Sequence, residues 1–116
     1  MLPSRRTVLL LALLPALATA APPAGEQARI DALIGAVEAE RDLRFVRNGK
    51  AYSAAEAAQF LREKQRMTGP DLATAEDFIE HIGSRSSTTG QPYLIRFADG
   101  RQQPAADFLR ARLAPR

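Results

Sequence analysis

Cysteine is missing from this 116-residue chain, and histidine occurs only once. Without cysteine the chain can form no disulfide, no thiolate nucleophile and no cysteine-ligated metal site. One histidine is too few for the clustered ligands of a zinc site, so we expect neither a metal nor a cofactor. The fold must therefore be held together by packing alone.

Clustered positive charge is also missing, although 16 basic residues outnumber 13 acidic ones and the net charge is +3. Two of the basic residues, Arg5 and Arg6, lie in an N-terminal segment that we expect to be removed, which leaves 14 basic against 13 acidic residues and a net charge of +1. Basic and acidic residues alternate elsewhere, as in Arg62-Glu63-Lys64. Because nucleic-acid binding normally needs basic residues gathered on one face, the sequence predicts a mixed solvated surface and no nucleic-acid partner.

The N-terminal segment predicts export from the cytoplasm. Arg5 and Arg6 precede an apolar run over residues 8–17 that only Pro15 interrupts, and Ala18-Thr19-Ala20 follows this run. Positive charge, a short apolar run and a small-x-small motif, in that order, are typical of a cleavable signal peptide. We therefore expect residues 1–20 to be removed by cleavage after Ala20 and the remaining chain to work in the periplasm.

Two alternatives concern the export step. The first is an uncleaved anchor, which the length of the apolar run disfavours because a membrane-spanning helix needs roughly 20 residues. No membrane span is therefore expected after cleavage. The second concerns the route, since residues 4–9 resemble a degenerate twin-arginine signal, whereas the long leucine-rich run favours export of the unfolded chain. The sequence leaves the route open.

The chain after cleavage keeps 96 of the 116 residues, which is enough for one domain with a modest core. Residues 21–25 are expected to be a flexible lead-in, and residues 26–116 a single domain. The elements predicted within this domain follow the order α-β-α-α-β-α. The predicted fold is α+β, with a short two-stranded antiparallel sheet covered by helices.

Four helices are predicted from apolar stripes at helical spacing and from their end signals. Ser53 stands three residues before Glu56, and Thr74 three residues before Asp77. At this spacing the hydroxyl caps an early backbone N–H group of the helix, and the acid reaches back to the cap. The residues expected on the buried faces are Ile30, Leu33, Ile34 and Val37; Ala57, Phe60 and Leu61; Ala75, Phe78, Ile79 and Ile82; and Ala105, Phe108, Leu109 and Leu113.

Two strands are predicted at residues 43–47 and 93–97, where large apolar residues alternate with others. Asn48-Gly49 and Asp99-Gly100 follow them and favour tight turns. Each turn leads into a helix with a similar string, Ala57-Ala58-Gln59-Phe60-Leu61-Arg62 and Ala105-Ala106-Asp107-Phe108-Leu109-Arg110. This similarity indicates either two strand-turn-helix units related by a pseudo-twofold axis, with antiparallel strands, or chance, because capped helices after turns use the same few residue types.

Several uncommon strings occur together in one order along the chain. They are Phe45-Val46-Arg47-Asn48-Gly49, Glu56-Ala57-Ala58, Phe60-Leu61-Arg62-Glu63-Lys64, Thr74-Ala75-Glu76-Asp77-Phe78-Ile79 and Ser84-Arg85-Ser86-Ser87-Thr88-Thr89-Gly90-Gln91-Pro92-Tyr93. In these strings the chain resembles the YfeK-like family of small exported bacterial proteins, over nearly all of the segment that follows the signal. The resemblance implies an exported single domain. It implies no catalytic or binding role, since the family has no assigned activity.

Residues 84–92 are expected to form a loop, and residues 84–90 are its most unusual stretch, because hydroxyls and a guanidinium lie beside a glycine just after a helix end. Such a loop can donate several hydrogen bonds to an anion or a sugar. The turn after the first strand would converge on this loop if the two strands pair. The candidate binding residues are Arg47, Asn48, Arg85, Ser86, Ser87, Thr88, Gly90 and Tyr93. The alternative is that the hydroxyls cap local backbone groups and only shape the loop.

These patterns predict a non-enzymatic binding or interaction module of the cell envelope, whose partner is an envelope protein or a polar or anionic small molecule. A cavity between the loop and the turn would favour a small ligand, and a flat apolar patch would favour a protein. The alternative function is a small envelope hydrolase that uses His81, Asp77 and a nearby serine. No catalytic residue is assigned, because Asp77 already has a capping role and no nucleophile motif is present.

Overall fold

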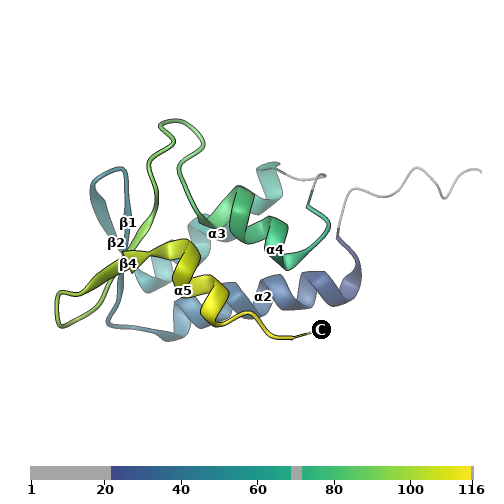
Figure 1. The fold of residues 1–116 in the computed structure, drawn as a ribbon, viewed down its shortest axis with the longest axis horizontal. Helices are drawn as coiled ribbons and strands as arrows, with labels where there is room; N and C mark the ends of the chain where they lie inside the picture. Colours follow the sequence, from purple (N-terminus) through teal and green to yellow (C-terminus); the bar gives the residue numbers. More distant parts are fainter. Residues whose placement is uncertain (1–21, 69–71, 116) are drawn as a thin grey trace, which may run out of the picture.

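The structure, a computed structural model, describes residues 22–68 and 72–115 (Figure 1). The predicted export signal at residues 1–20 lies outside these described residues. The elements in chain order are helix α2 (Ala24–Ala39), strands β1 (Arg44–Arg47) and β2 (Lys50–Ser53), helix α3 (Ala54–Thr68), helix α4 (Ala75–Phe78) continued by the π-helix η3 (Ile79–Gly83), strands β3 (Leu94–Arg96) and β4 (Gln102–Pro104), and helix α5 (Ala105–Ala111). The α+β class predicted from the sequence is confirmed.

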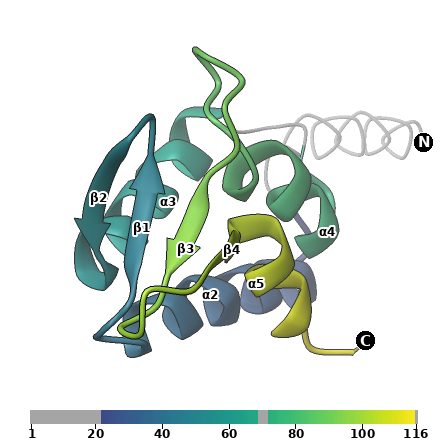
Figure 2. The ribbon, with the colours of Figure 1, turned by 60° about the vertical axis from the view of Figure 1, so that its left-hand side comes forward.

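The four strands form one antiparallel sheet in the order β2-β1-β3-β4 (Figure 2). The two predicted strands are the central pair, joined antiparallel with Phe45 opposite Ile95. The predicted two-stranded sheet is wrong, however, because a second strand follows each turn and completes a hairpin. The element order is therefore α-β-β-α-α-β-β-α.

The strands that the sequence did not predict are the two edges of the sheet. β2 and β4 carry no alternation of large apolar residues, and neither strand has a buried residue. An edge strand of this kind is stabilised by pairing with its neighbour, which a local pattern cannot reveal. Pro104 ends β4, a position that tolerates proline because its missing N–H group is not needed inside the sheet.

The first hairpin turns at Asn48-Gly49, where the backbone φ angles are 50° and 81°. Two consecutive positive φ values belong to the type I′ turn, whose twist matches that of the paired strands. Asparagine and glycine are the residues that adopt these values at least cost. The turn predicted from the sequence is therefore confirmed, and it directs the chain back along β1.

The repeat suggested by the sequence corresponds to two hairpin-helix units whose first strands, β1 and β3, pair with each other. Each helix begins at the residue directly after its hairpin, Ala54 in one unit and Ala105 in the other. The buried positions then correspond in order, Ala54, Ala57 and Ala58 with Ala105, Phe108 and Leu109. This register differs by three residues from the string similarity, because the hairpins and not the strings determine where the helices start.

One core lies between the sheet and the helices. In Figure 2, α2 and α3 lie behind the sheet, and α5 continues from β4. Inward-facing Phe45, Tyr93 and Ile95 pack there against the helices, and each is at most 1% exposed. The helix side of this core consists mainly of the residues expected from the apolar stripes: Ile30, Leu33, Ile34, Val37, Ala57, Leu61, Ala75, Phe78, Ile79, Ile82, Ala105, Phe108 and Leu109.

The helix ends follow the predicted signals with small shifts. Ser53 and Glu56 exchange backbone and side-chain hydrogen bonds, and Thr74 and Asp77 form a complete capping box. Helix α2 begins at Ala24, inside the segment 21–25 expected as a lead-in, whose flexibility stays a prediction. Within residues 22–68 and 72–115, no helix is long and apolar enough to cross a membrane.

Two helical glycines allow a matched test of the packing. A Cβ atom on Gly83 would meet the Leu109 Cδ1 atom at 2.6 Å, whereas a Cβ atom on Gly35 would meet nothing within 4 Å. We expect Gly83→Ala to lower the free energy of unfolding by about 1–3 kcal/mol through overpacking. Gly35→Ala should raise it by about 0.5–1 kcal/mol, because alanine restricts the unfolded chain. Urea unfolding of both variants measures the two changes, and a neutral Gly83→Ala would contradict the packing of η3 against α5.

Candidate functional site

The antiparallel pairing of β1 with β3 brings the loop at residues 84–92 beside the β1–β2 turn. Figure 1 shows the loop rising next to this hairpin at one end of the molecule. Asn48 Nδ2 donates to Ser86 Oγ at 3.3 Å, and Thr89 Oγ1 donates to Asn48 Oδ1 at 2.6 Å. The convergence expected from strand pairing is therefore present, through hydrogen bonds between residues 38 and 41 positions apart.

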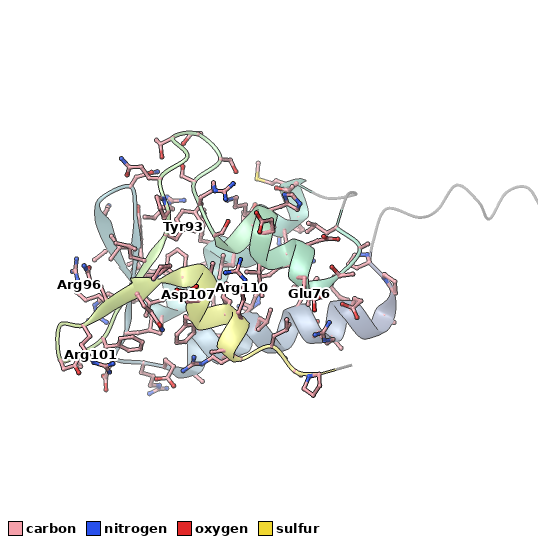
Figure 3. All side chains as sticks on the ribbon, in the orientation of Figure 1. Glu76, Tyr93, Arg96, Arg101, Asp107 and Arg110 are labelled. Carbon is pink, nitrogen blue, oxygen red and sulfur yellow. The ribbon has the colours of Figure 1, made fainter. Side chains whose placement is uncertain are left out.

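A cavity of about 280 Å³, called here the polar cavity, lies between the loop, the turn and α3. Its lining residues are Arg47, Asn48, Phe60, Lys64, Ser86, Ser87, Thr88 and Tyr93. Six of the eight candidate binding residues therefore surround one space, and their role in binding stays a prediction. Tyr93 is nearly fully buried at the base of the loop (Figure 3).

Arg85 and Gly90 do not line the polar cavity. The Arg85 guanidinium is exposed and lies 3.7 Å from the Glu80 carboxylate. Gly90 has a φ angle of 76°, and its N–H group donates to the Ser86 carbonyl at 3.0 Å. Gly90 thus closes the turn at the tip of the loop, and Arg85 faces solvent on the outside.

The hydroxyls of Ser86 and Thr89 form hydrogen bonds with backbone groups of the same loop. Ser86 is 5% exposed, and its Oγ atom accepts from the backbone N–H groups of Thr88 and Thr89 at 3.2 Å each. Thr89 Oγ1 accepts from the Gln91 N–H group. The alternative that hydroxyls cap local backbone groups is thus confirmed for Ser86 and Thr89. Ser87 is exposed, and no hydrogen bond within the described residues engages its hydroxyl.

Arg47 extends its guanidinium over the ring of Phe60, 4.1 Å from the ring centroid. Its single hydrogen bond within the described chain is a long one, to the Tyr52 hydroxyl at 3.4 Å. A guanidinium has five N–H donors, and stacking on a ring leaves those in its plane unused. Arg47 therefore holds a fixed position and keeps donors for another group.

Lys64 is a residue that the sequence argument placed on a solvated surface, and this was wrong. It is half-buried one helical turn after Phe60, and its Nζ atom donates to the carbonyls of Ile82 and Arg85 and to the Tyr93 hydroxyl, at 2.9–3.0 Å. These three acceptors use all three N–H groups of the ammonium. The signal in the sequence was the spacing Phe60-x-x-x-Lys64, which puts a cation and a ring on one helix face.

The two cations of the polar cavity affect each other. Burial and, to a smaller extent, the charge of Arg47 together lower the pKa of Lys64 to about 8. Burial raises the pKa of Tyr93, an effect that Arg47 partly offsets. Among the ion pairs of the described residues, none involves Arg47 or Lys64. The polar cavity therefore holds two cations, neither of which forms an ion pair with a described carboxylate.

A second hollow, called here the aromatic cavity, adjoins the first and has a volume of about 330 Å³. Its lining residues are Phe45, Arg47, Tyr52, Glu56, Ala57, Gln59, Phe60 and Glu63. Phe60 was predicted to be buried but is partly exposed, because it forms a wall of both cavities. Its ring packs edge-on against Tyr93 with the centroids 5.8 Å apart, which keeps it in place.

The parts proposed for a hydrolase are not assembled here. His81 is exposed in η3, lines neither cavity and makes no hydrogen bond to a described serine or to Asp77. The Asp77 carboxylate instead accepts from the backbone N–H groups of Ala73 and Thr74. Over residues 22–68 and 72–115, no group of three His, Asp or Glu side chains could hold a metal ion.

The half-buried ammonium of Lys64 predicts a pH dependence of stability. The folded protein releases this proton near pH 8, whereas the unfolded chain keeps it to about pH 10.5. Between these values the unfolded state binds more protons, so the free energy of unfolding should rise with pH. Lys64→Met should flatten this rise, and Lys50→Met, at the other lysine, which is exposed, should retain it. Urea unfolding from pH 8 to about 9.5, below the range where Tyr93 ionises, measures both slopes.

Comparisons with known proteins identify a family for this chain. The Family of unknown function (DUF5329) matches residues 24–115, almost all of the described chain. The uncharacterised protein YfeK of Salmonella typhimurium is 47% identical over 70 residues, which is 60% of this chain and 58% of that protein. No solved structure matches. These findings confirm the resemblance to YfeK, and the chain belongs to the Family of unknown function (DUF5329).

Proposed function

We propose that this protein is exported and acts in the cell envelope as a non-enzymatic binding module, whose polar cavity takes the anionic group of a small polar molecule. The observation that carries this proposal is the pair of cations, Arg47 and Lys64, on one cavity without a carboxylate partner in the described part of the chain. Seven other arginines of the described chain are paired with carboxylates, as Arg62 is with Glu38 at 3.0 Å. The remaining unpaired basic residues among those described, Arg41, Arg44, Lys50 and Arg96, do not line the polar cavity.

Electrostatics favours an anion in this cavity. Burial is the main cause of the lowered pKa of Lys64, and repulsion by the charge of Arg47 lowers this pKa in the same direction. An anion between them offsets this repulsion, and its effect is large because the site is partly screened from water. Arg47 supplies the direct donors, whereas Lys64 acts through its charge because its N–H groups are taken. The stacking of Arg47 on Phe60 reduces the ordering cost of binding.

The surface of the domain favours a small ligand over a protein partner. Among the described residues, Met67 is the one large apolar side chain that is well exposed, at 78%. A single exposed side chain makes no apolar patch of the size that protein interfaces use. The concave features are instead the two adjoining cavities, each near the lower end of the roughly 300–1,000 Å³ found for small-molecule sites.

The export part of the proposal rests on the order of charge, apolar run and small residues before Ala21. We expect the protein recovered from the periplasm of bacteria expressing the full chain to begin at Ala21 when its mass is measured. Ala20→Leu should block cleavage, because the peptidase needs a small residue at this position. Recovery of the wild type from the cytoplasm with residues 1–20 intact would contradict export.

The anion site is tested by titrating the mature protein with acetate and phosphate at constant ionic strength, while NMR follows the Ser87 and Thr88 amides and the Arg47 side chain. We expect saturable shifts at these groups. Arg47→Gln should weaken the affinity by about tenfold to a hundredfold, the range of a lost charge-assisted hydrogen bond. The affinity should also fall as the pH rises through 8, because Lys64 then loses its charge.

Arg44→Gln is the matched control for Arg47→Gln. Arg44 lies three residues earlier on β1, is exposed, and faces Arg96 across the central strand pair on the other side of the sheet. Its removal changes the net charge by the same amount without touching the polar cavity. If both variants weaken binding equally, the anion effect is general screening of charge. If neither variant weakens binding, Arg47 does not contact the anion. Either outcome shows that the proposed site is wrong.

A further inference from the structure

The two cavities share two walls, the guanidinium of Arg47 and the ring of Phe60. One ligand can therefore occupy both cavities. Its anionic group would lie beside Arg47 in the polar cavity, and its other part would extend past Arg47 and Phe60 into the aromatic cavity. The aromatic cavity offers the partly exposed rings of Tyr52 and Phe60, and the nearly buried ring of Phe45 also lines it. The second part of such a ligand must be able to pack against rings.

The aromatic cavity also has a polar rim of hydrogen-bond acceptors. Glu56, Gln59 and Glu63 lie at spacings of three and four residues on one face of α3. The Glu56 carboxylate accepts from the Ser53 N–H group through one oxygen, and Glu63 is paired with Arg66. Each carboxylate keeps further acceptor sites. This rim attracts hydroxyl groups and repels a second anion.

The two cavities differ in charge and polarity, and this difference indicates which part of the ligand lies in each cavity. Positive charge and a free hydroxyl, from Arg47, Lys64 and Ser87, lie in the polar cavity. Rings with a rim of acceptors lie in the aromatic cavity. We propose that the ligand is an anionic sugar, with its acid group at Arg47 and its ring stacked in the aromatic cavity with hydroxyls on the α3 rim.

This inference rests on the proposed function and narrows it to one ligand class. A sugar ring has an apolar face for the aromatic rings and hydroxyl donors at its edge for the carboxylates of Glu56 and Glu63. An aromatic acid has the apolar face but no hydroxyl donors, so it would desolvate the rim without satisfying it. A simple anion would use the polar cavity alone.

The test compares matched ligands on the mature protein by NMR titration. The acidic sugars are glucuronate, galacturonate and N-acetylmuramate, and their neutral counterparts are glucose, galactose and N-acetylglucosamine. Acetate and benzoate serve as an anion without a sugar and an aromatic acid. We expect at least one acidic sugar to bind about tenfold more tightly than its neutral counterpart, acetate and benzoate, because it alone fills both cavities.

Two variants of one side chain locate the sugar ring. Both variants lose the long hydrogen bond from Arg47 to the Tyr52 hydroxyl, so they are compared with each other. Tyr52→Ser should bind the acidic sugar about tenfold more weakly than Tyr52→Phe does, whereas the two variants should bind acetate alike, which also shows that Tyr52→Ser is folded. Tyr52→Phe keeps the ring and should bind the sugar as the wild type does, within about twofold. Arg47→Gln should weaken the binding of both the sugar and acetate.

The outcomes separate this inference from the proposed function. If acetate binds through Arg47 but no acidic sugar binds more tightly than acetate, or benzoate matches the best sugar, the sugar inference is wrong and the anion site stands. If Tyr52→Ser, compared with Tyr52→Phe, weakens acetate and sugar alike, the sugar ring is not in the aromatic cavity and the inference again fails. If neither acetate nor phosphate binds and Arg47→Gln changes nothing, the proposed function itself is wrong.

Discussion

The antiparallel pairing of β1 with β3 is the contact on which the rest of this domain depends. It joins two hairpin-helix units that lie far apart in the sequence, and the outer strands β2 and β4 are added to it as edges. Because the strands are antiparallel, the end of β1 lies beside the start of β3. The Asn48-Gly49 turn and the loop at residues 84–92 must therefore meet, and the polar cavity forms where they do.

Lys64 links the stability of this region to its charge. Its ammonium joins α3 to the end of η3 and to Tyr93, where carbonyls at a helix end favour a cation. The same group is half-buried near Arg47, which lowers its pKa. The protein thus keeps two neighbouring positive charges in place through hydrogen bonds and ring contacts, without a carboxylate partner among the described residues. Side chains with perturbed pKa values of this kind are found most often at functional sites.

The match to the DUF5329 family covers residues 24–115. It assigns no activity, and a fold does not determine a function. The functional argument therefore depends on the site itself. Arg47 and Phe60 matter most in that argument, because they are the residues common to both cavities.

The sequence alone determined the features that depend on neighbouring residues: the caps at Ser53 and Thr74, the turns at Asn48-Gly49 and Asp99-Gly100, and the apolar stripes of the helices. Only the tertiary structure decided the edge strands, because these are stabilised by the strand beside them. It also decided the register of the repeat and the burial of Lys64, whose three acceptors lie 18 to 29 residues away. Contacts over such separations depend on how the two units pack, which no local pattern records.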